Sequence, residues 1–485
     1  MEPFRKTLRS PLFAALVLLL GGALAVPGRA QEASRGFEDD FVDRTMRVDY
    51  FHTGGVGVEI VSLDRVVSDG AWAGSRTRLI DDTGLGLYRF EVRDAETGRA
   101  LYTRGFASIF GEWETTGEAR AAHRTFHESV RFPWPRRPVV VSLEKRDGTG
   151  GFREVWSTDV EPDSRFVNTA DPTPVGTLIP LLENGSPHEK VDVVLVGEGY
   201  AVDELPKFRA DAQRLLARLF DTEPFRSRRD DFNVRALHLP SAASGVTRPR
   251  AAEFRRTPLS AEYNIFDSER YLLTYDNRAL REALAAVPYE FVEILVNEKQ
   301  YGGGGIFNAQ ATVAVDTEFA DYIFIHEFGH HFAALADEYY TSSVAYETGG
   351  TEHPEPWEPN VTALHDPARL KWGDLVAPGT PLPTPWPKQA YEEHASEVRA
   401  RRQALIDRGA PAEEFDALFV EQRMIERELL SALRGDGVVG AFEGAMYEAR
   451  GLYRPEVDCI MFTRADFFCQ VCRRAIQRII DLYAS

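Results

Sequence analysis

The stretch His326-Glu327-Phe328-Gly329-His330 decides the expected fold, because it matches the core of a zinc hydrolase site. Residues four positions apart on an α-helix lie one turn apart on the same face, so both histidines can direct an imidazole at one metal ion. Glu327 lies off that face, but close enough to take a proton from a metal-bound water. The apolar run 323–325 ahead of the motif predicts a buried helix, with Asp316 or Thr317 as its N-cap.

A catalytic zinc ion usually takes three protein ligands and one water molecule, so a third ligand is expected beyond the two histidines. Asp337 falls on their helical face, but it lies about 10 Å beyond His330 along an unbroken helix. It can bind only if the helix ends near Ala334 and the chain folds back. Glu338 is the second candidate, whereas His331 points about 100° away from His330 and is expected to pack in the core. More distant candidates are His353, His365 and His394.

The first thirty residues have the three parts of a secretory signal peptide. The basic residues Arg5, Lys6 and Arg9 precede an apolar run over 12–20, and Gly28-Arg29-Ala30 offers small residues for cleavage. We therefore expect residues 1–30 to be removed and the mature protein to be secreted or periplasmic. The apolar run is shorter than the ~20 residues that span a membrane, so no membrane attachment is expected after cleavage, with an uncleaved anchor as the alternative.

Acidic side chains outnumber basic ones along the chain. There are 75 Asp and Glu against 56 Lys and Arg, which gives a formal net charge of −19. A negative charge of this size repels phosphate backbones and anionic lipid headgroups. Nucleic acid is therefore not an expected partner.

Two regions of different periodicity predict two domains. Over residues 40–165 the pattern is strand-like: Tyr88 to Arg93 alternates apolar and polar residues, and Asp147 to Gly151 is a hairpin signature. This region is expected to be an all-β sandwich. A linker rich in Asp, Pro and Thr precedes residues 175–485, where strands and helices alternate as in an α/β catalytic domain.

Within the second region, Val191 to Val196 is a continuous β-branched run that predicts a buried central strand. The glycine-rich stretch 301–306 is interpreted as a bend, and the strand 308–315 as a sheet edge that pairs with the substrate backbone. The Pro-rich segment 341–388 is expected to wall the cleft, and 389–434 to form a helical hairpin. The other expected elements are helices over 203–220 and 268–286 and strands over 232–239 and 289–296.

Only three cysteines occur, and all lie near the C-terminus: Cys459, Cys469 and Cys472. An exported chain could oxidise one pair and leave one thiol, and the sequence leaves the pairing open. Because no second CxxC occurs, a four-cysteine zinc site is excluded. Cys472 lies on an apolar helical stripe, so we expect a role in packing or stapling rather than in catalysis.

Several stretches of the chain resemble the IgA-peptidase-type family of secreted bacterial zinc metallopeptidases. Beyond the metal motif and its continuation to Tyr340, they are Val193 to Tyr200, Tyr301 to Asn308, Glu355 to Asn360, Gly440 to Gly444 and Tyr453 to Thr463. The resemblance covers the chain from about residue 180 to its end and, less specifically, the β region ahead of it. It implies a metzincin-like catalytic domain.

The resemblance also implies roles for single residues. His326 and His330 would be metal ligands, with Asp337 as the third, and Glu327 would be the general base. Met461 would form a methionine turn that packs beneath the metal. Relatives often carry Gly where this chain has Ala334.

One tyrosine is a further catalytic candidate. Tyr453 lies shortly before Met461, where a tyrosine stabilises the oxyanion in some metzincins. The alternative is a tyrosine that packs in the core.

These observations predict an α+β multidomain protein that acts as a secreted zinc-dependent endopeptidase. An all-β sandwich precedes a metzincin-like zinc peptidase domain, the cofactor is Zn²⁺, and the substrate is a protein or peptide. Two alternatives stay open. One is a zinc amidase that acts on cell-wall peptides, and the other is a non-catalytic binding protein on a peptidase fold.

Overall fold

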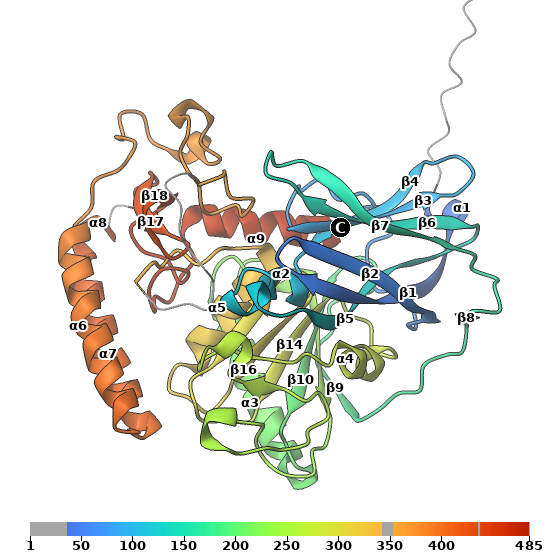
Figure 1. Cartoon of the computed structure of the whole chain (residues 1–485), viewed down its shortest axis with the longest axis horizontal. Coiled ribbons are helices and arrows are strands. Elements are labelled where there is room, and N and C mark those ends of the chain that lie inside the picture. The colour runs from blue at the N-terminus through green and yellow to red at the C-terminus, as the bar shows by residue number, and fades with distance from the viewer. Residues whose placement is uncertain (1–35, 342–352, 435–436, 485) are drawn as a thin grey trace, which may run out of the picture. The chain divides into compact units, whose positions relative to one another are not determined.

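The computed structural model describes residues 36–341, 353–434 and 437–484 (Figure 1). The signal peptide expected over 1–30 and part of the Pro-rich segment, residues 342–352, lie outside the described residues. Within the described ranges, none of the helices combines the length and the apolar character that crossing a membrane requires.

Two four-stranded sheets make up the N-terminal region (Figure 1). The first has the order β5-β1-β2-β8 and the second the order β4-β3-β6-β7, and every pair except β2–β8 is antiparallel. The bounds are β1 Phe41–Gly55, β2 Val58–Ser68, β3 Tyr88–Asp94, β4 Ala100–Phe106, β5 Arg124–Pro135, β6 Val139–Arg146, β7 Phe152–Val160 and β8 Val167–Asn168. Short helices α1 (Phe37–Asp40) and α2 (Ile109–Trp113) and the 3₁₀ turn Gly117–Arg120 accompany them.

The two sheets share one hydrophobic core. Val48 and Phe132 from the first sheet belong to the same buried cluster as Val92 and Val141 from the second. The all-β character expected over 40–165 therefore agrees with the observed strands. The sandwich arrangement itself stays a prediction.

A buried histidine joins strands of the first sheet. The His52 imidazole pairs through Nδ1 with Glu128 and through Nε2 with Glu59, each at 2.9 Å. Burial alone would lower the pKa of His52, but these two carboxylates outweigh burial and raise the pKa to about 9. The charged imidazole therefore stabilises the folded chain fully below pH 6.5, and this contribution is lost as the pH rises through 9.

We expect His52→Gln to change the pH dependence of stability. Between pH 6 and pH 10, the drop in the free energy of unfolding should be smaller in the variant than in the wild type by about 3 kcal/mol. Chemical denaturation at the two pH values measures this difference. The exposed His123, changed to Gln, is the matched control and should behave as the wild type. Equal pH dependence in His52→Gln and wild type would contradict the charged pairing.

A six-stranded sheet forms the centre of the second region, with the order β15-β16-β14-β10-β11-β9. Strands β10, β11, β14 and β16 are parallel, and β9 and β15 run antiparallel at the two edges. The predicted central strand is confirmed, because β10 lies between β14 and β11 and is buried along its whole length. The bounds are β9 Thr177–Leu182, β10 Val191–Glu198, β11 Phe232–His238, β14 Phe291–Val296, β15 Gly303–Ile306 and β16 Gln310–Ala314.

Helices cover both faces of this sheet. Alternate β10 residues such as Val193 share a core with α3 (Leu205–Asp221), α5 (Ala320–Ala333) and α9 (Gln470–Tyr483). The intervening residues such as Val194 share a core with α4 (Asn277–Leu284) on the opposite face. Alternation along one strand therefore places the metal-motif helix α5 and the C-terminal helix α9 on the same side.

The helix expected over 268–286 is shorter than predicted. It begins at Asn277, where the Asp276 side chain accepts a hydrogen bond from the Ala279 N–H as an N-cap. The residues before it instead form β13 (Leu272–Leu273), paired with β12 (Glu262–Tyr263). Asp276 is the local signal that the sequence interpretation passed over.

The expected helical hairpin is present as α6 (Lys388–Asp407) and α7 (Ala412–Leu429), which lie side by side (Figure 1). Gly409, with φ of 61°, turns the chain between them. The remaining elements are α8 (Ser431–Arg434) and the hairpin of β17 (Phe442–Ala445) and β18 (Glu448–Arg454). Short 3₁₀ turns occur at Val202–Glu204, Arg229–Asp231, Pro249–Ala251, Ile265–Asp267, Pro367–Arg369 and Gly373–Leu375.

Candidate metal centre

Helix α5 carries the metal motif, but it begins later than predicted. Its N-cap is Phe319, which makes no side-chain cap, so the expected cap at Asp316 or Thr317 is wrong. The Thr317 hydroxyl instead accepts a hydrogen bond from the Phe319 N–H (3.4 Å), inside the turn that leads from β16 into the helix. The helix therefore starts without a capping side chain.

The helix ends at the position that the third ligand requires. Ala334 takes the left-handed conformation, with φ of 55° and ψ of 31°. The Ala334 N–H donates to the His330 carbonyl (3.1 Å), which is the bond of an αL C-cap, and the Leu335 N–H donates back to the Gly329 carbonyl (3.3 Å). The chain therefore folds back over the end of α5 instead of carrying Asp337 further along the helix axis.

This turn brings three ligand atoms together. His326 Nε2 and His330 Nε2 lie 3.1 Å apart, and Asp337 Oδ1 lies 3.0 Å from the first and 3.2 Å from the second. Zinc bonds of about 2.0–2.1 Å at tetrahedral angles place neighbouring ligand atoms about 3.3 Å apart. The triangle of donor atoms therefore has the size of one face of a zinc coordination shell.

The protonation of the two imidazoles points to a cation as well. His326 Nδ1 donates to the Ile460 carbonyl (2.9 Å), and His330 Nδ1 donates to the Leu335 carbonyl. A carbonyl oxygen can only accept, so in each neutral ring the proton is on Nδ1 and the lone pair is on Nε2. In the neutral form of both rings, two Nε2 lone pairs and a carboxylate oxygen converge on one point, which is the donor set that a zinc ion takes.

The charges around His330 also favour a cation at this point. Burial alone would lower the pKa of the His330 imidazole, but the Asp337 carboxylate outweighs burial and raises that pKa to about 9. Burial would raise the pKa of Asp337, but the two histidines hold it well below its usual range. Positive charge is therefore stabilised at this point, whether a proton or a metal ion supplies it.

Glu327 lies beside the triangle. Burial raises the pKa of its carboxyl group, and the neighbouring His326 and His330 act against that rise. A carboxylate with a raised pKa is a stronger base than an exposed one. Glu327 therefore has the position and the basicity to accept a proton next to the three donor atoms.

The glycine-rich stretch is a strand and not the predicted bend. Residues 303–306 form β15, the edge of the six-stranded sheet, directly against α5. A Cβ on Gly305 would lie 2.4 Å from the Glu327 carbonyl oxygen and 2.9 Å from the His330 Cβ, and one on Gly303 would lie 3.0 Å from the Glu327 Cγ. The glycines therefore let this strand pack closely against the helix that carries the motif.

The predicted edge strand is consequently one strand further inside the sheet. Residues 310–314 form β16, which pairs with β14 on one side and with β15 on the other. On the outer side of β15, Gly303 makes an isolated bridge with Tyr271. Pairing of a substrate backbone with this edge stays a prediction, and it now concerns β15.

Two family models match the chain. The IgA Peptidase M64 model matches residues 179–480, and the Peptidase M64 N-terminus model matches residues 36–157. The chain belongs to the IgA peptidase M64 family. The gap between the matched ranges falls on the linker rich in Asp, Pro and Thr. No curated protein matches the chain.

A tyrosine that the sequence interpretation missed contacts the candidate metal centre of this M64 peptidase. The Tyr447 hydroxyl donates to the second carboxylate oxygen of Asp337, Oδ2. Tyr339 stacks on His326, with ring centroids 6.1 Å apart, and its hydroxyl accepts a hydrogen bond from Arg270 (3.1 Å). Tyr447 lies in the tight turn between β17 and β18, and no motif marks such a position in the sequence.

The contacts described for Tyr453 lie elsewhere. It stands opposite Glu443 at the base of the β17–β18 hairpin, and its backbone pairs with Thr362. In the described part of the chain, the tyrosine hydroxyls that bond to donor residues of the candidate metal centre are those of Tyr447, which binds Asp337 Oδ2, and Tyr322, which lies 3.3 Å from His326 Nδ1. An oxyanion role for Tyr453 therefore stays a prediction without a supporting contact.

Met461 lies under the motif helix of the M64 peptidase. A Cβ on Gly329 would lie 3.2 Å from the Met461 sulfur, so the glycine makes room for the methionine. The neighbouring Ile460 carbonyl holds His326, and the Met461 carbonyl accepts from the Glu338 N–H (2.8 Å). The loop around Met461 thus supports both a histidine and the segment that carries Asp337.

The alternative third ligand points away from the histidines. The Glu338 side chain accepts hydrogen bonds from Asn360 (2.9 Å) and Cys472 (3.3 Å). Asp337, and neither Glu338 nor the distant histidines, shares the described ligand cluster with His326 and His330.

A cavity of about 100 Å³ lies away from this centre. Its lining includes Tyr50 and Arg131 from the N-terminal region and Arg281 and Gln310 from the second region, and none of the donor residues. It is therefore a space between the two regions, separate from the donor triangle.

Proposed function

We propose that this M64 family member is an exported, zinc-dependent endopeptidase. The donor triangle of His326, His330 and Asp337 carries the proposal, because the Nε2 atoms of two imidazoles with fixed tautomers and a carboxylate oxygen converge at zinc-binding separation. A catalytic zinc usually keeps one position open for water, and three protein ligands leave that position. The helix, its sharp end and the methionine-bearing loop support a metzincin-like domain.

When bound here, zinc supplies a Lewis acid that lowers the pKa of water and polarises a peptide carbonyl. Glu327 accepts a proton from the attacking water molecule while the oxygen of that water bonds to the carbonyl carbon. Glu327 then donates that proton to the leaving amine as the C–N bond breaks. The raised pKa of Glu327 suits both steps, because the group must first take and then release one proton.

Two histidine contacts keep the ligands in place during this cycle. The Ile460 and Leu335 carbonyls fix the tautomers of His326 and His330, so their Nε2 atoms stay available for the metal. The Tyr447 hydroxyl holds the other oxygen of Asp337, which orients Oδ1 towards the histidines. These residues position the ligands and do not take part in the proton transfer.

Location and substrate class belong to the same proposal. The basic start and apolar run of residues 1–30 support export, and a net charge of −19 makes a nucleic-acid partner unfavourable. The family supports a protein or peptide substrate.

The experiment is a cleavage profile of the mature protein, recorded by mass spectrometry on an unfolded protein mixture and, separately, on cell-wall sacculi. We expect cuts at internal peptide bonds, loss of cutting with a chelator, and recovery when Zn²⁺ is restored. Release of cell-wall peptides alone would support the amidase alternative. Cutting that is insensitive to the chelator would overturn the zinc mechanism.

A further inference from the structure

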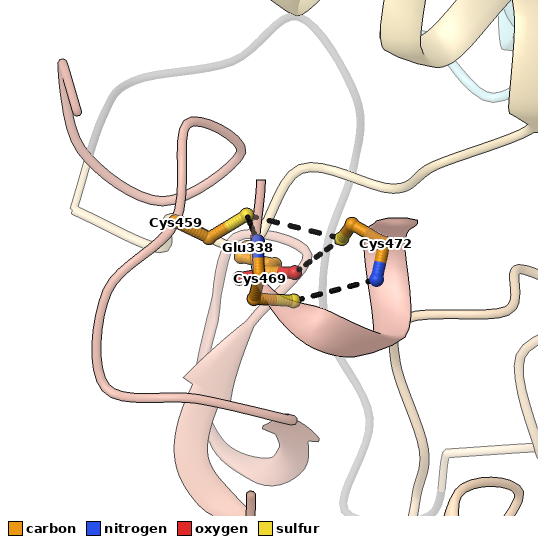
Figure 2. Close-up of side chains that lie close together, drawn as sticks. All are labelled: Glu338, Cys459, Cys469 and Cys472. Atoms are coloured by element: carbon orange, nitrogen blue, oxygen red, sulfur yellow. Dashed lines mark hydrogen bonds between the residues drawn. The ribbon is translucent and has the colours of Figure 1, made fainter. Parts of the chain in front are cut away.

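A second group of potential metal ligands includes Glu338, the residue that follows Asp337. Glu338, Cys459, Cys469 and Cys472 are all at most 1 % exposed, and their ligand atoms all lie within 4.8 Å of one another. Figure 2 shows the four side chains directed at one another. They come from three segments: the chain just after α5, the loop that leads to Met461, and the start of α9.

The separations within this cysteine cluster suit a tetrahedral zinc ion. The Cys459 and Cys472 sulfurs are 3.8 Å apart, and the Cys472 sulfur lies 3.3 Å from Glu338 Oε1. Zinc bonds of about 2.3 Å to sulfur and about 2.0 Å to oxygen put two sulfurs about 3.8 Å apart and a sulfur and an oxygen about 3.5 Å apart. The described geometry therefore needs only small side-chain shifts to surround an ion.

Packing alone does not account for the cluster. The Glu338 side chain is fully buried, and its Oε2 atom has no hydrogen-bond partner in the described part of the chain. An unpaired carboxylate oxygen in an apolar interior is costly, and a metal ion removes that cost. A disulfide fits less well, because its sulfurs bond at about 2.05 Å and a disulfide gives Glu338 no partner.

We propose that Glu338, Cys459, Cys469 and Cys472 bind a second zinc ion. The three thiols lose their protons on binding, and three thiolates with one carboxylate complete four-fold coordination, so no position remains for water or substrate. Thiolate sulfur favours Zn²⁺ over Ca²⁺ or Mg²⁺. The site is therefore structural.

The surroundings offset the negative charge of this ligand set. The Cys469 N–H donates to the Cys459 sulfur (3.3 Å), and the Cys472 N–H donates to the Cys469 sulfur (3.4 Å) at the positive end of helix α9. The buried Arg454 acts on Glu338 with its positive charge. Thiolates are stabilised by contacts of this kind.

A third cluster of potential metal ligands in the described residues does not require a metal ion to balance its charge. Asp49, Asp64 and His127 also lie within ligand distance of one another. Their carboxylates are paired with arginines: Arg47 and Arg65 bind Asp49, and Arg278 binds Asp64. Cations of the protein itself already neutralise that group, whereas the cysteine cluster has an orphaned oxygen.

The second zinc would hold the parts that shape the first site. Glu338 follows Asp337 directly, and Cys459 precedes Ile460, whose carbonyl fixes His326. Clamping these two segments to the start of α9 sets where the third ligand and the methionine loop lie. The second site itself stands on its own geometry, whether or not the histidine site is catalytic.

Metal analysis separates the two sites. We expect about two zinc ions per wild-type chain and about one in the His326→Ala/His330→Ala double variant, which keeps the cysteine cluster. Replacing that remaining zinc by Co²⁺ should produce the intense near-ultraviolet charge-transfer absorption that only thiolate ligands give. No zinc in the double variant, or a Cys459–Cys472 disulfide found by mass spectrometry of the native protein, would overturn the proposal.

Single variants then test the ligands. Adding Cys472→Ser to the double variant should abolish the cobalt–thiolate absorption. Glu338→Gln keeps the size of the side chain and should weaken zinc binding at the cluster at least about tenfold in chelator competition. Glu456→Gln, a buried neighbour that accepts the Gln470 N–H, is the matched control and should bind zinc as the wild type does. Should Cys472→Ser not fold, the cobalt spectrum of the double variant still decides the question, and equal affinity in Glu338→Gln and Glu456→Gln would remove Glu338 from the site.

Discussion

Glu327→Gln should retain zinc at the histidine site and lose peptidase activity. An amide of the same size cannot accept the proton of the attacking water, so kcat/KM should fall by about 10²–10⁴-fold. The proposed metal ligands His326, His330 and Asp337 are untouched, and metal content should therefore be the same as in the wild type. Cleavage of an unfolded protein and metal analysis of the same preparation measure the two quantities.

The matched control for this variant is Glu428→Gln, which makes the same chemical change at an exposed position of α7. It should cleave at the wild-type rate. Activity of Glu327→Gln within a few-fold of that control would remove Glu327 from the proton transfer. Loss of zinc in Glu327→Gln would instead assign it a role in holding the metal centre.

The sequence predicts best those features that one segment determines alone. The four-residue spacing of His326 and His330 is enough to place both imidazoles on one helical face. The helix rise requires a break near Ala334 before Asp337 can reach them, and Ala334 is indeed left-handed. The run 191–196 predicts a buried central strand by its composition, and β10 is that strand.

Features that depend on a close contact between distant segments are not visible in the sequence. The glycines of β15 look like a flexible bend because glycine carries no local preference for a strand. Their structural reason is the approach of α5, where a Cβ on Gly305 would lie 2.4 Å from the Glu327 carbonyl oxygen. Only the folded arrangement of strand and helix reveals that requirement.

The cysteine cluster is likewise not visible in the sequence. Three cysteines suggest one disulfide and a spare thiol, and the absence of a second CxxC excludes only a four-cysteine site. The fourth ligand is a carboxylate, Glu338, which lies 134 positions before Cys472. Tyr447 is a comparable case, because a turn residue reaches Asp337 across 110 positions without any motif.

Asp337→Ala should have the other large effect, because it removes the third ligand while His326 and His330 remain. Two imidazoles alone leave the metal with half of its usual tetrahedral shell. We expect zinc to leave the histidine site on dialysis and peptidase activity to fall by at least about 100-fold. The zinc of the cysteine cluster is counted separately, by its cobalt–thiolate absorption.

Tyr447→Phe is the matched comparison for Asp337→Ala. It removes only the hydroxyl that binds Asp337 Oδ2 and leaves Oδ1 available to the metal. Because this hydroxyl orients a ligand and is not one itself, the variant should keep a zinc ion, with an affinity lower by about 10–100-fold. Equal zinc retention in Asp337→Ala and Tyr447→Phe would show that the third ligand is another residue. The left-handed turn at Ala334 would then have no role in placing a metal ligand.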